Sequence, residues 1–276
     1  MAFWYLHPIV GQIEQNEVTI IFECVEDNLP IQVLIYTEDD YRLLRTLDIV
    51  SEEKGVTKIT LTLPDLVTYV LEWNCRSILH YRHKISLQDP SHYIFMSCDF
   101  LEADTSPSLW EKVKDEANDT VILHLGDQIY ADAEFREGMR IVKKDPHART
   151  KILELYRQRY RATWRRCHEA LSNTSNLFLW DDHELVNDYC ISSEHTPEEA
   201  IVAAVATDAY KEYQLACHRE DTIEGSFVRG LVTVLTVERT THAPSVEKIL
   251  ARLHATTTPK VFLCFASGPI PKPQGS

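Results

Sequence analysis

Two apolar runs, each broken off by a burst of polar side chains, constrain this chain more than any other feature of its sequence. The first, Val121–Leu125, runs into Gly126 and Asp127, with Tyr130 and Asp132 close behind. A short apolar run that stops at glycine is typical of a buried strand entering a tight turn. In an open α/β sheet, ligands bind just beyond the carboxyl ends of the strands, so we expect Asp127 there.

The second run, Leu177–Trp180, is followed at once by Asp181, Asp182, His183 and Glu184. Three carboxylates and an imidazole packed together without compensation would be unfavourable. A bound cation is the usual compensation, and Asp, Glu and His are its usual ligands. Alone, the first run also fits an ordinary turn with a solvated Asp127. The two runs together favour one shared metal site.

Composition excludes some functions. The 276 residues carry a formal net charge of −14, which argues against binding to the phosphate backbone of nucleic acids. An anionic substrate stays compatible, because bound cations invert the local field. No apolar run reaches 18 residues, so no membrane span is expected. The start lacks a secretory signal, and seven widely spaced cysteines without a Cys-x-x-Cys motif indicate reduced thiols, so we expect a cytoplasmic protein.

The pattern of elements predicts two domains, residues 1–90 and 91–276. The first is expected to be an all-β sandwich, because short runs rich in β-branched and aromatic residues alternate with turn signals. These runs are Val18–Cys24, Ile31–Tyr36, Lys58–Leu63, Tyr69–Asn74 and Arg76–Ser86. After Pro90, strands alternate with helices, which is typical of an α/β domain.

Within the second domain, we expect strands at Tyr93–Met96 and Lys260–Ala266, a strand pair or hairpin at 226–237, and helices at Ser108–Glu116 and Val246–Leu253. The segment after Asp132 is expected to be a loop over the site. A long amphipathic helix is predicted from Pro146 to Leu171, with five arginines on its polar face. That face is either solvated or a contact for an anionic substrate or partner. Another helix is expected to start at Thr196, which has capping-box spacing.

Three motifs carry a resemblance to a known family. Residues 126–132 (Gly-Asp-Gln-Ile-Tyr-Ala-Asp), 180–184 with 187–188, and Ser97-Cys98-Asp99 resemble the alkaline phosphatase D (PhoD-like) family of calcineurin-like metallophosphatases. The resemblance implies an α/β metallophosphatase-like domain, incomplete here, preceded by a fibronectin-type-III-like sandwich. It also implies a hydrolase that cleaves phosphomonoesters or phosphodiesters, including phospholipid-type substrates, at a dinuclear metal site.

The resemblance also assigns roles to individual residues. Asp127 is the expected bridge between two metal ions, and Asp182 is a ligand of the second ion. His183 is the expected general acid or phosphate contact. The first ion is expected to be held by Cys98 or Asp99, together with Tyr130. Fe, Zn, Ca, Mg and Mn all suit such donors.

Two points stay open around that site. Asp132, Asp181 and Glu184 are candidates to orient the ligands from behind. Cys98 fits a buried free thiol nearly as well as a ligand.

The family's last metal motif, a Gly-Asp-x-His-type element, is not found before or after Pro271. The chain is therefore expected to be a C-terminally shortened member. Two functions remain open: a metal-dependent phosphoesterase, or a catalytically inactive metallophosphatase-like domain that serves as a structural or interaction module. A protein partner that completes or replaces the missing part is a further expectation.

Overall fold

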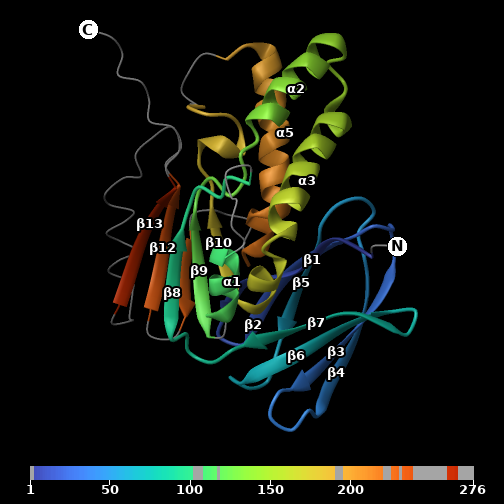
Figure 1. Cartoon of the computed structure of the whole chain (residues 1–276), viewed down its shortest axis with the longest axis vertical. Helices are drawn as coiled ribbons and strands as arrows, with labels where there is room; N and C mark the ends of the chain where they lie inside the picture. Colours follow the sequence, from blue (N-terminus) through green and yellow to red (C-terminus); the bar gives the residue numbers. More distant parts are fainter. Residues whose placement is uncertain are drawn as a thin grey trace.

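A computed structural model of the chain describes residues 3–101, 108–116, 119–189, 195–219, 225–229, 232–238 and 260–266. Figure 1 shows a β-only part, coloured blue to teal, below and beside an α/β part coloured green to red. Three helices, α2, α3 and α5, stand together on the α/β part. The predicted helix Val246–Leu253 lies outside the described residues.

The first part consists of two antiparallel sheets around one core. Their orders are β1-β2-β5 and β4-β3-β6-β7. Phe22 from the first sheet and Val33 and Trp73 from the second are all fully buried in that core. The strands are β1 (Trp4–Glu14), β2 (Glu17–Cys24), β3 (Pro30–Thr37), β4 (Leu43–Val50), β5 (Thr57–Thr62), β6 (Thr68–Cys75) and β7 (Ile78–Ser86). The closer likeness to a fibronectin type III domain stays a prediction.

Two of these strands are absent from the sequence prediction. β4 lies at a sheet edge and is largely exposed, so it lacks a strong apolar signal. β1 contains Pro8 and Gly11, which normally interrupt a strand. Gly11 is required by packing, because a Cβ at this position would lie 2.1 Å from the carbonyl oxygen of Cys217. β1 therefore joins the two parts: Val10 packs in the sandwich core and Ile9 in the α/β core.

The α/β part is built on a parallel sheet of order β10-β9-β8. A second sheet of order β11-β12-β13 lies beside it, and β13 contacts β9. The strands are β8 (His92–Met96), β9 (Thr120–Leu125), β10 (Ser175–Leu179), β11 (Gly225–Arg229), β12 (Val232–Glu238) and β13 (Lys260–Ala266). The helices are α1 (Ser108–Asp115), α2 (Asp132–Lys144), α3 (Arg149–Arg165), α4 (His168–Asn173) and α5 (Pro197–Tyr213). Short 3-10 helices are η1 (Asp182–Glu184) and η2 (Leu215–Cys217).

Two helix predictions were wrong. The segment after Asp132 is helix α2 rather than a loop, since Phe135, Gly138, Ile141 and Val142 face the core at helical spacing. Its close packing depends on Gly138, whose added Cβ would lie 2.9 Å from Val202. The predicted helix from Pro146 to Leu171 is instead α3 and α4, separated at 166–167. The predicted cap of α5 is confirmed, because Thr196 forms a reciprocal capping box with Glu199.

Neither alternative for the arginine face of this helix, solvation or contact with an anionic substrate or partner, describes four of its five arginines. Their side chains are only 11–19% exposed and each faces a carboxylate of the same chain. The pairs are Arg157–Glu212, Arg159–Glu134, Arg161–Glu23 and Arg166–Asp99. These arginines therefore hold neighbouring elements together.

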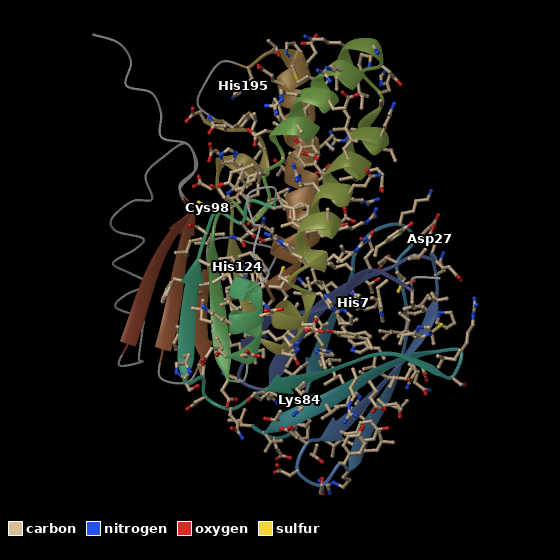
Figure 2. All side chains as sticks on the ribbon, viewed as in Figure 1. His7, Asp27, Lys84, Cys98, His124 and His195 are labelled. Carbon is tan, nitrogen blue, oxygen red and sulfur yellow. The ribbon has the colours of Figure 1, made fainter. Side chains whose placement is uncertain are left out.

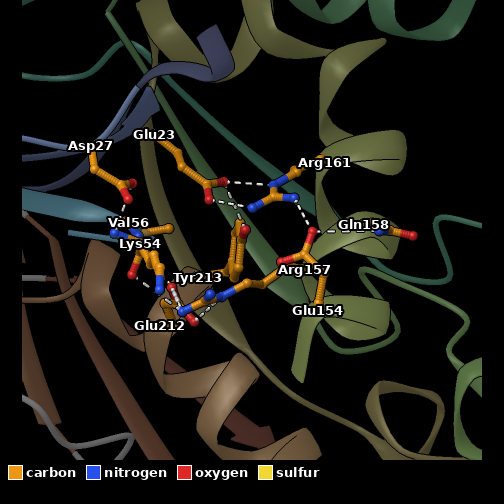
Figure 3. A network of polar contacts seen from close by, with 10 residues as sticks. All are labelled: Glu23, Asp27, Lys54, Val56, Glu154, Arg157, Gln158, Arg161, Glu212 and Tyr213. Atoms are coloured by element: carbon orange, nitrogen blue, oxygen red, sulfur yellow. Dashed lines mark hydrogen bonds and ion pairs between the residues drawn. The ribbon is translucent and has the colours of Figure 1, made fainter. Parts of the chain in front are cut away.

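Figure 3 shows the pairs that join the sandwich to the helices. Glu23 on β2 is 1% exposed and accepts bonds from Arg161 Nε at 2.9 Å and from the Tyr213 hydroxyl at 2.9 Å. Arg161 also donates to Glu154 at 2.6 Å. At the end of α5, Glu212 accepts from the backbone N–H of Val56 at 3.1 Å. The sandwich is thus fixed to α3 and α5 by buried charge.

Within the described ranges, no helix combines the length and apolar character that crossing a membrane requires.

We expect Arg161→Met to lower the free energy of unfolding by about 3–5 kcal/mol, because it leaves the Glu23 carboxylate buried without its cation. Urea denaturation followed by circular dichroism measures this loss. Arg140→Met is the matched control, since its side chain on α2 is 74% exposed beside Glu137 and its loss costs no more than about 1 kcal/mol. Equal losses in the two variants would contradict this account of the interface.

We also expect the interface to weaken in acid through His83 on β7. Its Nδ1 lies 2.6 Å from the carbonyl oxygen of Ser172. Burial lowers the pKa of His83 from 6.5 to about 4. The unfolded chain therefore takes up the proton first as pH falls. The stabilising contribution is complete above pH 6.5 and is lost towards pH 4, with a slope of up to about 1.4 kcal/mol per pH unit.

The measurement is the free energy of unfolding between pH 7 and 4.5 for the wild type and for His83→Gln. The variant keeps a donor for Ser172 but cannot titrate, so its stability should fall less steeply. Two parallel curves would show that His83 does not carry the effect.

Candidate metal centre

The site lies where two neighbouring parallel strands end. β9 and β10 pair in register, with Leu125 opposite Leu179. The chain turns after each of these residues, at 126–128 and at 180–184, so the two turns lie side by side. Asp127 has a positive φ of 55°, which directs the backbone sharply away from the sheet.

Gly126 allows the two turns to meet. Its φ is 94°, and a Cβ added here would lie 2.6 Å from the Cβ of Asp181. An L side chain would be strained in this conformation and would also collide with the neighbouring turn. The glycine in the first motif therefore sets how closely the two groups of carboxylates approach.

Three side chains converge at this junction. Asp127, Asp182 and His183 each present a possible ligand atom, and these atoms all lie within 4.8 Å of one another. Asp127 is 7% exposed; burial raises the pKa of its carboxyl, the charge of His183 opposes the shift, and Asp182 adds to it. Two carboxylates and an imidazole at such distances are a donor set that suits a bound cation.

Cys98 and Tyr130 approach the same oxygen of Asp127. The Cys98 thiol and the Tyr130 hydroxyl are each 3.5 Å from Asp127 Oδ2. Cys98 follows β8 and lies at the end of the sheet that carries the turns (Figure 2). It is exposed, so the alternative of a buried thiol was wrong. Burial, with the neighbouring Cys98 and Asp127, raises the pKa of Tyr130, so without a cation its hydroxyl is protonated.

Asp99, the alternative to Cys98 in the sequence prediction, is engaged elsewhere. Its carboxylate pairs with Arg166, and the side chain is 13% exposed. Its backbone N–H donates to the carbonyl oxygen of Asp127 at 2.8 Å. Asp99 therefore fastens the segment after β8 to the first turn, while its carboxylate is directed to an arginine.

His183 is held by a second carboxylate. Its Nδ1 lies 2.8 Å from Asp132 Oδ2, and its ring packs on Tyr130 with centroids 4.2 Å apart. Burial disfavours the charged ring, but the hydrogen bond and charge of Asp132, with Asp127 and Asp182, outweigh it and raise the pKa of His183. Because Nδ1 is engaged, Nε2 is the ring nitrogen left for a ligand or substrate.

Glu184 contributes more than sequence reasoning assigned to it. It is 1% exposed and accepts backbone N–H bonds from both turns, at Gln128 and at Asp181. Burial raises the pKa of Glu184, while the donors around both of its oxygens oppose that shift and favour the ionised carboxylate. The sequence contains a signal for this bonding role, because Asp181 and Glu184 have the spacing of a capping box. In the structure they form that capping box around η1.

A cavity of about 240 Å³ opens beside the centre, on the Cys98 side. Its walls include Met96, Phe100, Leu109 and Trp110, together with Cys98 and Gln128. Phe100 also packs against Tyr130, with ring centroids 4.7 Å apart. Ser97 and Asp99 complete the lining, so apolar and polar side chains both face this hollow, and Cys98 is the proposed metal donor that borders it.

A family model described as PhoD-like phosphatase matches residues 93–231, half of the chain. The chain belongs to the PhoD-like phosphatase family. The match contains all three motifs from which the family was predicted, and it begins at the second residue of β8.

Two solved structures share the fold of this PhoD-like chain. A structure described as that of PhoD has 17% identity and a TM-score of 0.65, over 88% of this chain and 53% of that one. Purple acid phosphatase PPD1 from yellow lupin (Lupinus luteus) seeds has 10% identity and a TM-score of 0.61, over 93% and 50%. The chain thus has a metallophosphatase-like fold and spans about half the length of each structure. No curated protein matches its sequence.

We expect Asp132→Asn to lower the pKa of His183, because the neutral amide no longer stabilises the charged ring. Nuclear magnetic resonance titration of labelled histidine rings in chelator-treated protein measures this pKa directly. Asp188→Asn is the matched control, since the Asp188 carboxylate accepts from Asn187 rather than from His183. Equal shifts in both variants, or none in Asp132→Asn, would contradict the described pairing.

Proposed function

We propose that the chain is a metal-dependent phosphoesterase that hydrolyses phosphate monoesters or diesters. The observation that supports this most is the convergence of Asp127, Asp182 and His183, within 4.8 Å, at the ends of two paired strands. This convergence occurs in a PhoD-like phosphatase family member, at the motif residues themselves. Substrates of the phospholipid type belong to the same chemical class.

The two oxygens of Asp127 face different neighbours, which suits a carboxylate between two cations. Oδ2 faces the thiol of Cys98 and the hydroxyl of Tyr130. Oδ1 lies 3.4 Å from the backbone nitrogen of His183, on the side of the second turn. We therefore assign one cation to Cys98, Tyr130 and Asp127, and another to Asp127 and Asp182.

Sulfur and phenol oxygen donors suit iron or zinc, and a carboxylate position also suits calcium, magnesium or manganese. Cations bound there supply positive charge that attracts the phosphate and makes water a better nucleophile. The protein's own contribution is to hold anionic donors close together in a partly buried place.

His183 is assigned to the substrate. Asp132 holds Nδ1, so the ring is oriented and its charged form is favoured. Nε2 can then donate a proton to the leaving oxygen of the ester, which would otherwise depart as an unstable alkoxide. Tyr130, packed on the ring, limits its rotation.

The sandwich is proposed to be a fibronectin-type-III-like module. The sheets of three and four antiparallel strands support this. Its role in the proposed function is to support α3 and α5, through the buried bonds of Glu23 and Glu212.

Asp127→Asn is expected to abolish both stoichiometric metal binding and phosphate ester hydrolysis, because an amide is a poor bridge and carries no charge. His183→Ala should retain the metal and lose about 10²–10⁴-fold in kcat. Metal analysis by mass spectrometry measures the first effect. Phosphate release from alkyl phosphate monoesters and diesters, whose leaving alkoxides need a proton, measures the second. Asp48→Asn on β4, exposed and remote from the centre, is the control that should change neither.

Thermal melting separates this proposal from a catalytically inactive module. With metal bound, Asp127→Asn and chelator should each lower the melting temperature, because a ligand of the folded state alone stabilises it. In an inactive module without metal, the variant should melt at the same temperature or higher, since it relieves repulsion between carboxylates. That second result, together with no ester cleavage, would overturn the proposed function.

A further inference from the structure

The carboxylate of Glu184 is shared between the two turns that carry the proposed metal ligands. Its Oε2 accepts from the backbone N–H groups of Asp127 at 3.2 Å and Asp181 at 2.7 Å. Its Oε1 accepts from the N–H of Gln128 at 2.7 Å and from Nε2 of Gln214 at 2.9 Å. Each turn therefore contributes at least one donor, and all four partners donate to one buried side chain.

Gln214 ties this carboxylate to the helices behind it. It is fully buried at the end of α5, and its Nε2 also lies 3.2 Å from the Tyr160 hydroxyl on α3. The preceding residue, Tyr213, donates instead to Glu23 in the sandwich. Two adjacent residues thus bind different partners: Tyr213 anchors α5 to the sandwich, and Gln214 anchors Glu184.

We propose that Glu184, held by Gln214, is a positioning residue that sets the separation of Asp127 and Asp182 before any cation binds. This inference rests on the proposed function and adds the means by which its ligands are kept together. The need for such a device follows from charge, because two carboxylates this close repel each other without a cation. Bonds to the backbone on both sides resist that repulsion without occupying a ligand position.

The isosteric change Glu184→Gln tests the bonds rather than the volume. Whichever oxygen becomes the amide nitrogen, two of the four donors then face another donor. In either orientation of the amide, one of these two donors is the backbone N–H of Asp127 or of Gln128. The first turn therefore loses a hydrogen bond to residue 184 in both cases. Outer groups that orient metal ligands typically contribute 10–100-fold to metal affinity, which sets the size of the expected effect.

The experiment measures the dissociation constants of Mn²⁺, Zn²⁺ and Ca²⁺ by isothermal titration calorimetry, for the full chain well below its melting temperature. Glu184→Gln should weaken the affinity of the bound metal about 10-fold or more. Tyr213→Phe is the matched control: it also removes a buried hydrogen bond at the end of α5, but on the sandwich side. It should melt at a lower temperature and keep its metal affinity within twofold.

If Glu184 only stabilises the fold, Glu184→Gln should melt at a lower temperature and bind metal with the same affinity as the Tyr213→Phe control. That result overturns the inference and leaves the proposed function standing. A wild-type chain that binds none of the three cations contradicts the proposed function, and the inference with it. If Glu184→Gln does not fold, Gln214→Met removes a single donor, and its affinity must fall below that of Tyr213→Phe for the inference to hold.

Discussion

The in-register parallel pairing of β9 with β8 and β10 is the constraint on which the rest of the centre depends. Parallel neighbours end at the same edge of a sheet, so the segments after three strands meet there. The ladder even continues past the strands, because the N–H groups of Cys98 and Asp99 donate to the carbonyl oxygens of Gly126 and Asp127 at 3.3 and 2.8 Å. Backbone bonds thus bring Cys98 to Asp127 before any side chain contributes.

The side chains then solve a problem that this pairing creates. It concentrates negative charge at one edge, and burial makes that charge more costly. Three interactions offset this negative charge. Arg166 takes up Asp99, His183 is shared between Asp132 and the centre, and Glu184 binds backbone N–H groups. Asp127 and Asp182 also accept backbone N–H groups, from His183 and Asp188, yet their ligand atoms lie within 4.8 Å of each other, which is why the geometry favours a metal there.

The N-terminal sandwich supports the same site through its interface with the α/β part. β1 is shared between the two cores, and Glu23 is buried against Arg161 and Tyr213. A charge pair of this kind specifies one arrangement, since any other would leave an ion buried alone. The helices that stand behind the turns are therefore fixed from the sandwich side, although no residue of the sandwich reaches the metal donors among the described contacts.

Sequence reasoning found the strand ends and their carboxylates because both signals are local: an apolar run, then a glycine or an acidic burst. It also found the family from those motifs. It missed α2, whose packing rests on the contact of Gly138 with Val202, and the break at 166–167. It placed the arginines of α3 on a face open to solvent or to an anionic partner, because their actual partners, such as Glu23 and Glu212, are distant in the chain. It left open which of Asp99 and Cys98 faces Asp127, since that depends on the pairing of Asp99 with Arg166.

The most direct test is a crystal structure of the protein soaked in Mn²⁺, with anomalous diffraction used to locate the ion. The account predicts an anomalous peak between the carboxylates of Asp127 and Asp182, within ligand distance of both. A peak confined to other carboxylates, or none at this junction at a concentration that stabilises the protein in solution, would contradict the assignment of these two turns as a metal centre.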